Sequence, residues 1–260
     1  MKWIGLARDC ALVALATLAP LPLQHRSFPT YTRTFQLEPT ADTSANVSIG
    51  DVNGDGKLDI VLIKGRHWPG MSRVMLGNGH GEFTTRHDLS DARYRSYSGN
   101  LVDVNGDGAP DVILSNDAPD PKVILVNDGR GDFRLAGTFG RPSWATRNVA
   151  VADLNGDGRP DIVVANRGDH AAQYVCLNEG DGRFDASCSA FADYSATTIT
   201  PADIDHDGHI DLIVPHRDAV KVTSISTTGT PTFRTTAACR SGHQTPPCGW
   251  PPPLTSTETA

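Results

Sequence analysis

The residues with the clearest chemistry are carboxylates that recur in short loops. Each loop has nine residues, with oxygen-bearing side chains at positions 1, 3, 5 and 9 and a glycine at position 6. Calcium prefers six to eight oxygen ligands at about 2.3–2.6 Å, drawn from carboxylates, amides and carbonyls. A loop of this kind can wrap one ion if the backbone carbonyl of position 7 contributes as well. The pattern therefore predicts structural metal binding rather than catalysis.

Four loops have this pattern, and their first residues are 52, 50 and 50 positions apart. The predicted metal ligands are Asp51, Asn53, Asp55, Lys57 and Asp59; Asp103, Asn105, Asp107, Ala109 and Asp111; Asp153, Asn155, Asp157, Arg159 and Asp161; and Asp203, Asp205, Asp207, His209 and Asp211. Lys57, Ala109, Arg159 and His209 are expected to contribute backbone carbonyls only. The predicted cofactor is Ca²⁺, up to four ions with one in each loop. Asp205 replaces an asparagine in the fourth loop, so we expect that loop to bind at least as tightly as the others.

Two other structures share parts of this pattern. A lone Asp-x-Asn-x-Asp-Gly sequence also forms solvated turns, and an EF-hand opens in the same way. An EF-hand requires glutamate at position 12 and flanking helices. Position 12 here is occupied by Leu62, Leu114, Val164 or Val214. Carboxylates crowded into nine residues repel one another without a cation, so we expect metal to stabilise the loops and chelation to release them.

The segments around the loops predict the strands that position them. Apolar runs such as Ile60–Ile63 and Ile162–Val164 follow each loop directly, as in strands buried on both faces. A second landmark keeps the same step along the chain: Gly81-Glu82-Phe83, Gly131-Asp132-Phe133 and Gly182-Arg183-Phe184. Turn sequences such as Asn127-Asp128-Gly129 are typical of hairpins. Each unit therefore predicts about four antiparallel strands in 50 residues, the size of a propeller blade.

These units resemble FG-GAP or VCBS-type repeats, the blades of integrin-α-like β-propellers, over roughly residues 45 to 215. The resemblance implies a calcium-loaded propeller on a secreted or surface protein, used for adhesion or ligand binding or appended to an enzyme. The resemblance also implies that a closed propeller of this family has seven blades. We therefore expect an all-β fold at residues 35–218, a partial β-propeller of about four antiparallel four-stranded blades. An open arc of this kind needs the missing blades or another copy to cover its edge.

The charge and the hydrophobic content of the chain exclude several classes of protein. The formal net charge is −7, and 13 of the 30 acidic residues lie in the four loops. One Ca²⁺ in each loop would bring the formal charge to +1, so the acid excess is interpreted as site charge. The acidic balance argues against a nucleic-acid partner. Hydrophobic residues make up 38% of the chain, which excludes wholesale disorder, and no apolar run is long enough for a multi-span membrane protein.

The two ends of the sequence differ from the repeats. Residues 1–24 resemble a secretory signal peptide, which predicts a secreted, cell-surface or periplasmic protein with no membrane span in the mature chain. Residues 219–260 are rich in threonine, serine and proline and are interpreted as a low-complexity tail or as a frameshifted continuation. Read one base earlier, the codons of residues 255–260 can encode Asp-Leu-Asn-Gly-Asp-Gly, where the next loop is due. A truncated product without a function of its own is a further alternative.

Several smaller motifs leave alternatives open. Cys176 and Cys188 lie across a predicted hairpin and either form a disulfide or remain thiols. Residues 130–132 and 167–169 are Arg-Gly-Asp sequences, which either serve adhesion or satisfy turns that need glycine and aspartate. Asn46 begins a glycosylation sequon.

The predicted function is an extracellular binding or adhesion scaffold for an unknown protein or glycan ligand, not an enzyme. The alternative is a polysaccharide lyase-like enzyme on a calcium propeller, whose candidate cluster is Arg93, Tyr94, Arg95 and Tyr97. The aromatic rings of Trp68, Tyr94, Tyr97 and Trp144 either stack on sugars or pack in the core or at its rim, and packing is the preferred interpretation.

Overall fold

The computed structural model describes residues 34, 36–38, 42–168, 171–184, 188–216, 222–228 and 230–236. The chain divides into two units, Met1–Pro39 and Thr40–Ala260. In the first unit, residues 34 and 36–38 form neither helix nor strand. The predicted signal peptide and residues 237–260 of the predicted tail lie outside the described residues.

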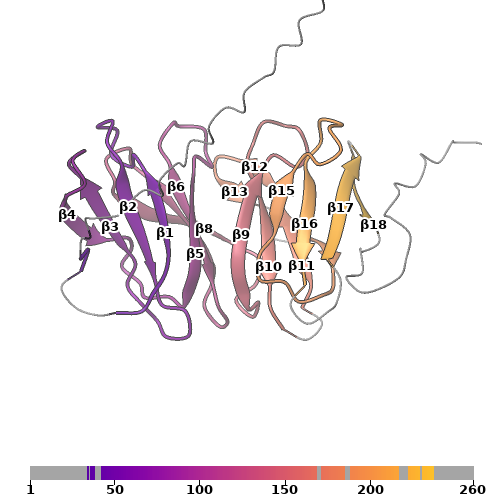
Figure 1. Ribbon diagram of the computed structural model, residues 1–260, viewed down its shortest axis with the longest axis horizontal. Coiled ribbons are helices and arrows are strands. Elements are labelled where there is room, and N and C mark those ends of the chain that lie inside the picture. Colours follow the sequence, from indigo (N-terminus) through magenta and orange to yellow (C-terminus); the bar gives the residue numbers. More distant parts are fainter. Residues whose placement is uncertain are drawn as a thin grey trace, which may run out of the picture. The chain divides into compact units, whose positions relative to one another are not determined.

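The second unit is built from strands arranged in four four-stranded sheets (Figure 1). The first sheet contains β1 (Ser44–Gly50), β2 (Asp59–Lys64), β3 (Arg73–Gly77) and β4 (Phe83–Asp88). The second contains β5 (Ser96–Val102), β6 (Asp111–Asn116), β7 (Lys122–Asn127) and β8 (Phe133–Phe139). The third contains β9 (Thr146–Ala152), β10 (Asp161–Asn166), β11 (Gln173–Cys176) and β14 (Ser189–Ala192). The fourth contains β15 (Thr200–Ala202), β16 (Asp211–Pro215), β17 (Val222–Thr228) and β18 (Thr230–Thr236).

Each sheet is an antiparallel meander in which neighbours in sequence pair in space. The third sheet has an insertion, because the short hairpin of β12 (Asn178–Gly180) and β13 (Arg183–Phe184) lies between β11 and β14. Within the described residues no helix has both the length and the apolar character needed to cross a lipid bilayer.

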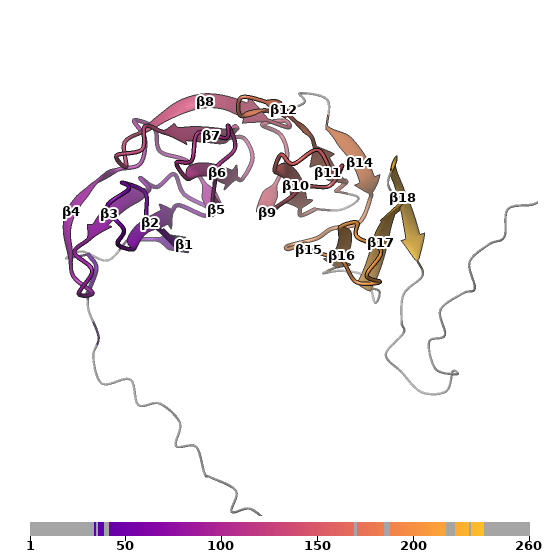
Figure 2. The same ribbon diagram turned by 90° about the horizontal axis from the view of Figure 1, so that it is seen from above.

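The first strands of the four sheets, β1, β5, β9 and β15, are neighbours in that order. Figure 2 shows the sheets following one another along an arc with these strands on its inner side. The predicted all-β partial propeller of four blades is therefore confirmed.

The hydrophobic core lies between consecutive sheets. Alternate residues of a strand point to opposite faces, so β6 sends Val112 and Leu114 toward the first blade and Ile113 toward the third. All three side chains are at most 1% exposed. A third cluster, which includes Val163 and Leu212, joins the third and fourth blades. This two-sided burial is why the second strands read as unbroken apolar runs.

The fourth blade extends beyond residue 218, where the sequence placed the end of the propeller. The backbone of β17 pairs with β16, and β18 pairs with β17. Threonine is β-branched and fits a pleated sheet, so a threonine-rich segment forms strands despite its low-complexity appearance. The predicted tail therefore contains half of a blade.

Candidate metal centres

The four acidic loops occupy equivalent places in the fold. Each joins the first strand of a blade to the second, so all four lie at the same end of their sheets as the hairpins that join third and fourth strands. Position 1 organises each loop. In the first loop, Asp51 Oδ1 accepts hydrogen bonds from Gly54 N at 2.8 Å and Asp55 N at 3.2 Å, while Oδ2 accepts one from Gly56 N at 2.8 Å. Asp103 and Asp153 accept the equivalent three bonds.

Position 4 requires a left-handed backbone. Gly54 has φ 73°, Gly106 has φ 79° and Gly156 has φ 75°. His206 adopts φ 62° at the same place in the fourth loop and is exposed. A side chain resists this conformation, so the fourth loop is the one that carries strain at position 4.

The aspartate at position 9 is buried in every loop. Asp59, Asp111, Asp161 and Asp211 are at most 1% exposed. In the second blade, Asp111 Oδ2 accepts a hydrogen bond from Val104 N at 3.0 Å and Oδ1 accepts one from Asn127 N at 2.8 Å. This carboxylate therefore ties the loop to the end of the third strand. Asp59 and Asp161 make the same pair of bonds.

Burial raises the pKa of the position 9 aspartate in the second and third loops. Desolvation raises the pKa of Asp111 above its ordinary value, and the charges of Asp107 and Asp103 act in the same direction, although two backbone N–H groups oppose them. The pKa of Asp161 is raised for the same reasons, with Asp157 and Asp153 as the neighbouring charges. A negative charge at position 9 of the second and third loops is thus unfavourable until something positive compensates for it.

Position 5 differs among the loops in its side-chain partners. Asp55 Oδ2 lies 3.1 Å from Lys57 Nζ, and Asp157 Oδ2 lies 2.5 Å from Arg159 Nη2. The backbone N–H and side chain of Lys57 lower the pKa of Asp55. The second and fourth loops have Ala109 and His209 at position 7 in place of these cations. The first and third loops therefore carry a compensating positive charge that the other two lack.

The fourth loop brings three carboxylates together. Oxygen atoms of Asp203, Asp205 and Asp211, at positions 1, 3 and 9, all lie within 4.8 Å of one another. Asp207 lies outside this group, and its Oδ1 accepts a hydrogen bond from His209 N at 2.9 Å. Two oxygens that share a calcium ion are separated by at most about twice the 2.3–2.6 Å bond length, so the spacing of these three donors is compatible with one shared ion.

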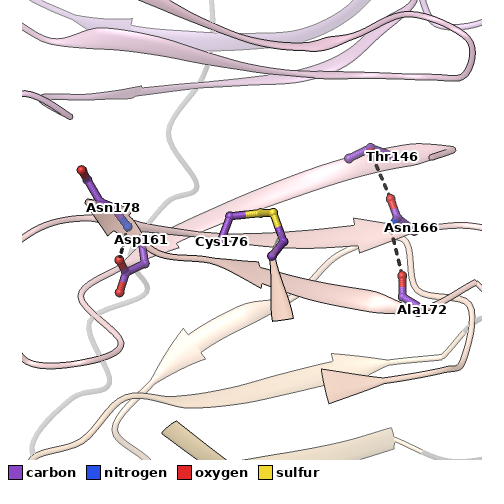
Figure 3. Close-up of a disulfide and its surroundings, with 7 residues drawn as sticks. Thr146, Asp161, Asn166, Ala172, Cys176 and Asn178 are labelled. Atoms are coloured by element: carbon purple, nitrogen blue, oxygen red, sulfur yellow. Dashed lines mark hydrogen bonds between the residues drawn. A yellow bond between two sulfur atoms is a disulfide. The ribbon is translucent and has the colours of Figure 1, made fainter. Parts of the chain in front are cut away.

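The structure adds a residue to the loops that sequence analysis assigned only to a turn. Asn127 Nδ2 donates to the carbonyl of Val52 in the preceding blade at 2.8 Å and to Pro110 O at 3.1 Å. Asn178 makes equivalent bonds to Val104 O at 2.9 Å and Pro160 O at 3.2 Å. Figure 3 shows Asn178 beside Asp161. Recurrence of asparagine about 16 residues after position 9 was the available signal.

Cys176 and Cys188 form a disulfide with a Cα–Cα distance of 4.3 Å. It connects β11 to the residue preceding β14, across the inserted hairpin (Figure 3). Of the two alternatives for these cysteines, the structure has the bridge.

The four residues of the candidate lyase cluster have different surroundings. Arg95 Nη1 forms an ion pair with Asp120 Oδ1 at 2.8 Å. Tyr94 packs against the core between the first two blades, and burial raises its pKa. Arg93 is exposed, and the Tyr97 hydroxyl lies 3.1 Å from His67 Nδ1.

The aromatic and Arg-Gly-Asp predictions have mixed outcomes. Trp144 stacks on Tyr174 with ring centroids 4.0 Å apart, so packing between blades is confirmed for this ring. Core packing is wrong for Trp68, which is 74% exposed because it lies in the loop between β2 and β3. Residues 130–132 form the β7–β8 turn, in which buried Gly131 has φ 88°. Asp169 of the other such sequence lies outside the described residues.

A family model for the FG-GAP-like repeat matches residues 51–114, 103–164 and 155–214. These matches cover more than half of the chain and begin at or within the acidic loops. The chain belongs to the FG-GAP-like repeat family. The matched FG-GAP-like repeats overlap, and each runs from one acidic loop to the second strand of the next blade.

Two solved structures resemble this FG-GAP-like chain at low identity. The crystal structure of the V. cholerae biofilm matrix protein Bap1 has 17% identity and a TM-score of 0.40, covering 71% of this chain and 35% of that one. The Bacillus licheniformis rhamnogalacturonan lyase PL11 has 16% identity and a TM-score of 0.43, covering 69% of this chain and 40% of that one. The chain thus spans well under half the length of either protein. A search of curated proteins finds no match.

Proposed function

We propose that this protein is a calcium-binding β-propeller repeat protein that acts as an extracellular binding scaffold. The observation that carries the calcium assignment is the group of Asp203, Asp205 and Asp211, whose oxygens lie within 4.8 Å of one another. Hard oxygen donors at this separation suit Ca²⁺. The first three loops offer an asparagine oxygen where the fourth offers Asp205.

The ion would act as a structural counter-charge. It would lie among the side chains of positions 1, 3 and 9, with position 5 and the carbonyl of position 7 as further donors. The buried aspartate at position 9 already joins the loop to the third strand, so neutralising it stabilises that junction. Bound calcium therefore strengthens the same contacts that hold consecutive blades together.

The loops should differ in affinity. Calcium affinity depends on the charge of the ligand set. Lys57 and Arg159 offset one negative charge in the first and third loops, whereas the second loop has no such cation and the fourth has four aspartates. We therefore rank the fourth loop tightest, the second next, and the first and third weakest.

An extracellular location is supported by the disulfide between Cys176 and Cys188. Such bonds persist in oxidising compartments and are rare in the cytosol. A scaffold role follows from the fold, since rigid blades present loops at both ends and loops on rigid scaffolds usually carry binding. The ligand is a protein or a glycan in this proposal.

Thermal melting with added calcium tests the proposal. A ligand at about 100 times its Kd stabilises the folded state by about 2.7 kcal/mol per site, which predicts a rise of several degrees in Tm. Magnesium should have a smaller effect, because it demands octahedral geometry and keeps its water.

Substitutions separate the loops from general charge effects. Asp203→Asn should remove the tightest site, and Asp205→Asn should weaken it toward the affinity of the second loop. Asp181→Asn is the matched control, since its side chain is 87% exposed and lies outside the loops. A Tm that does not respond to calcium in the wild-type protein would refute the assignment.

A further inference from the structure

A second group of functional side chains lies at the opposite end of the blades from the acidic loops. The loop of residues 65–72 joins β2 to β3 and is fixed to the entry of the second blade. Arg66 N donates to Ser96 O at 2.9 Å, while Gly70 and Tyr94 exchange two backbone hydrogen bonds of 2.9 and 3.1 Å. The side chains of this loop therefore project from a backbone held in place by two blades.

The loop holds its arginine in a strained conformation. Arg66 has φ 67°, in the left-handed region that disfavours residues with a side chain. In the third blade, the residue two positions after the second strand is Gly168, the type that such a place favours. Strained residues persist where surrounding structure forces them and cluster at binding sites. The conformation is thus a reason to ask what Arg66 does.

Tyr97 connects this loop to the next two blades. Its hydroxyl lies 3.1 Å from His67 Nδ1, and the two rings meet edge to face with centroids 5.8 Å apart. The guanidinium of Arg147 lies 4.1 Å from the centroid of the Tyr97 ring, and that of Arg66 lies 5.9 Å from it. Tyr97 and Arg147 are each the extra residue of a β-bulge, near the starts of β5 and β9.

The charges in this group are unequal. Arg147 Nη1 forms an ion pair with Asp117 Oδ1 at 2.7 Å, without hydrogen-bond geometry, and its side chain is 12% exposed. Arg66 is exposed, and among the described residues no carboxylate lies within ion-pair distance of it. Trp68 adds an indole that is 74% exposed. The guanidinium of Arg66 thus approaches the phenol ring of Tyr97, and its loop also carries an exposed indole and an exposed imidazole.

We propose that Arg66, His67, Trp68 and Tyr97, with Arg147 holding the Tyr97 ring in position, bind an acidic oligosaccharide through a uronate carboxylate. This inference names a ligand class for the scaffold and so rests on the proposed function. The planar guanidinium of Arg66 matches a carboxylate with two parallel hydrogen bonds. The indole of Trp68 offers a flat apolar face to the C–H groups of a sugar ring, while His67 and Tyr97 supply hydrogen bonds for hydroxyl groups.

The surroundings favour a glycan over the other polyanions and over a protein. The chain has a formal charge of −7, and four acidic loops lie at the far end of the blades, which opposes the long phosphate backbone of a nucleic acid. A stable protein interface needs a broad contact area with an apolar centre. Trp68 instead has the polar residues Arg66 and His67 close to it in the sequence, unlike the apolar centre of such an interface.

Titration calorimetry of the full chain with an oligogalacturonate, and with a neutral oligosaccharide of equal length, tests the site. The acidic probe should bind and the neutral one should bind at least about tenfold more weakly. Trp68→Ala and Arg66→Asn should each weaken binding of the acidic probe about tenfold, and Trp68→Phe should retain most of it. Arg130→Gln removes one exposed positive charge at the acidic-loop end and should leave binding unchanged.

The Arg66→Asn variant also separates binding from folding. Asparagine tolerates the left-handed region, so this variant should melt at or above the wild-type temperature while it loses affinity. Equal binding of the neutral sugar, an equal loss in Arg130→Gln, or equal affinity for single-stranded DNA would each overturn the proposal.

The measurement is made with chelator and again with calcium, after circular dichroism has shown that the protein is folded in both. Binding in chelator together with a calcium-insensitive Tm would refute the metal assignment and leave the glycan site standing. A calcium-dependent Tm without binding of the acidic probe would refute the glycan site and leave the metal assignment standing.

Discussion

The side-chain amide of Asn178 donates a hydrogen bond of 2.9 Å to the backbone carbonyl of Val104, 74 residues earlier in the chain. Val104 is position 2 of the second acidic loop, and its own N–H is bound by Asp111. One asparagine thus connects its own hairpin turn, its own acidic loop and the acidic loop of the preceding blade. The acidic loops and the seams between blades are parts of one hydrogen-bonded arrangement.

Removing this asparagine should loosen a seam. Asn127→Ala leaves the buried carbonyl of Val52 and the half-buried carbonyl of Pro110 without their donor. Each buried unsatisfied group costs about 1–3 kcal/mol, so we expect the free energy of unfolding to fall by about 2–3 kcal/mol. Urea denaturation measures the change. Asn78→Ala is the control, because Asn78 bonds only within its own turn and should cost less than about 1 kcal/mol. Equal losses in the two variants would contradict the role of the seam.

A buried lysine should give the protein a distinctive dependence on pH. Lys122 is 0% exposed, and its Nζ donates to the carbonyls of Asp120, Pro142 and Trp144. Burial lowers its pKa from 10.5 to about 8. Between these two values the unfolded chain binds the proton and the folded chain does not, so the free energy of unfolding should rise with pH there, by at most about 3 kcal/mol. Below pH 8 both states are protonated and this contribution to the slope vanishes.

The third blade supplies the matched variant. Gln173 occupies the corresponding first position of β11, and its Nε2 donates to the carbonyls of Asn166, Ala171 and Tyr194. Lys122→Gln should keep a neutral donor while removing the dependence between about pH 8 and 10.5. Lys57→Gln, at an exposed lysine, should leave it intact. Chemical denaturation across this range measures the slopes, and parallel slopes for wild type and Lys122→Gln would refute the assignment.

The strain at His206 should be removable. His206→Gly places glycine at φ 62°, as in the other three loops, and should raise the free energy of unfolding by about 0.5–1 kcal/mol. The reverse change, Gly54→His, should lower it by a similar amount, since the nearest atom to a Cβ there is a backbone oxygen at 3.7 Å. Thermal melting in calcium-free buffer compares the pair. If His206→Gly proves destabilising, the side chain has a role beyond occupying a turn.

Much of this structure follows from short-range patterns in the sequence. The repeat step, the glycines and the apolar runs predicted the blades because each reflects local backbone conformation or two-sided burial. The sequence also predicted that Asp203, Asp205 and Asp211 come together, since all three belong to one loop. The role of Asn178 was not predicted, because its partner lies in another blade: the recurrence of asparagine after position 9 marks the residue but does not show that it reaches across a seam. The contact between Arg147 and the Tyr97 ring was not predictable for the same reason, since it depends on how two blades pack together.

The placement of the apolar clusters between sheets, and not inside any one of them, bears on how such a chain can evolve. A solitary sheet would expose both faces, so a gene segment encoding one repeat gains stability only beside a neighbour. Each tandem duplication then adds one blade together with one interface between blades. Adding a whole repeat therefore supplies the interface that stabilises it, whereas insertion of half a repeat would leave an apolar surface exposed to water.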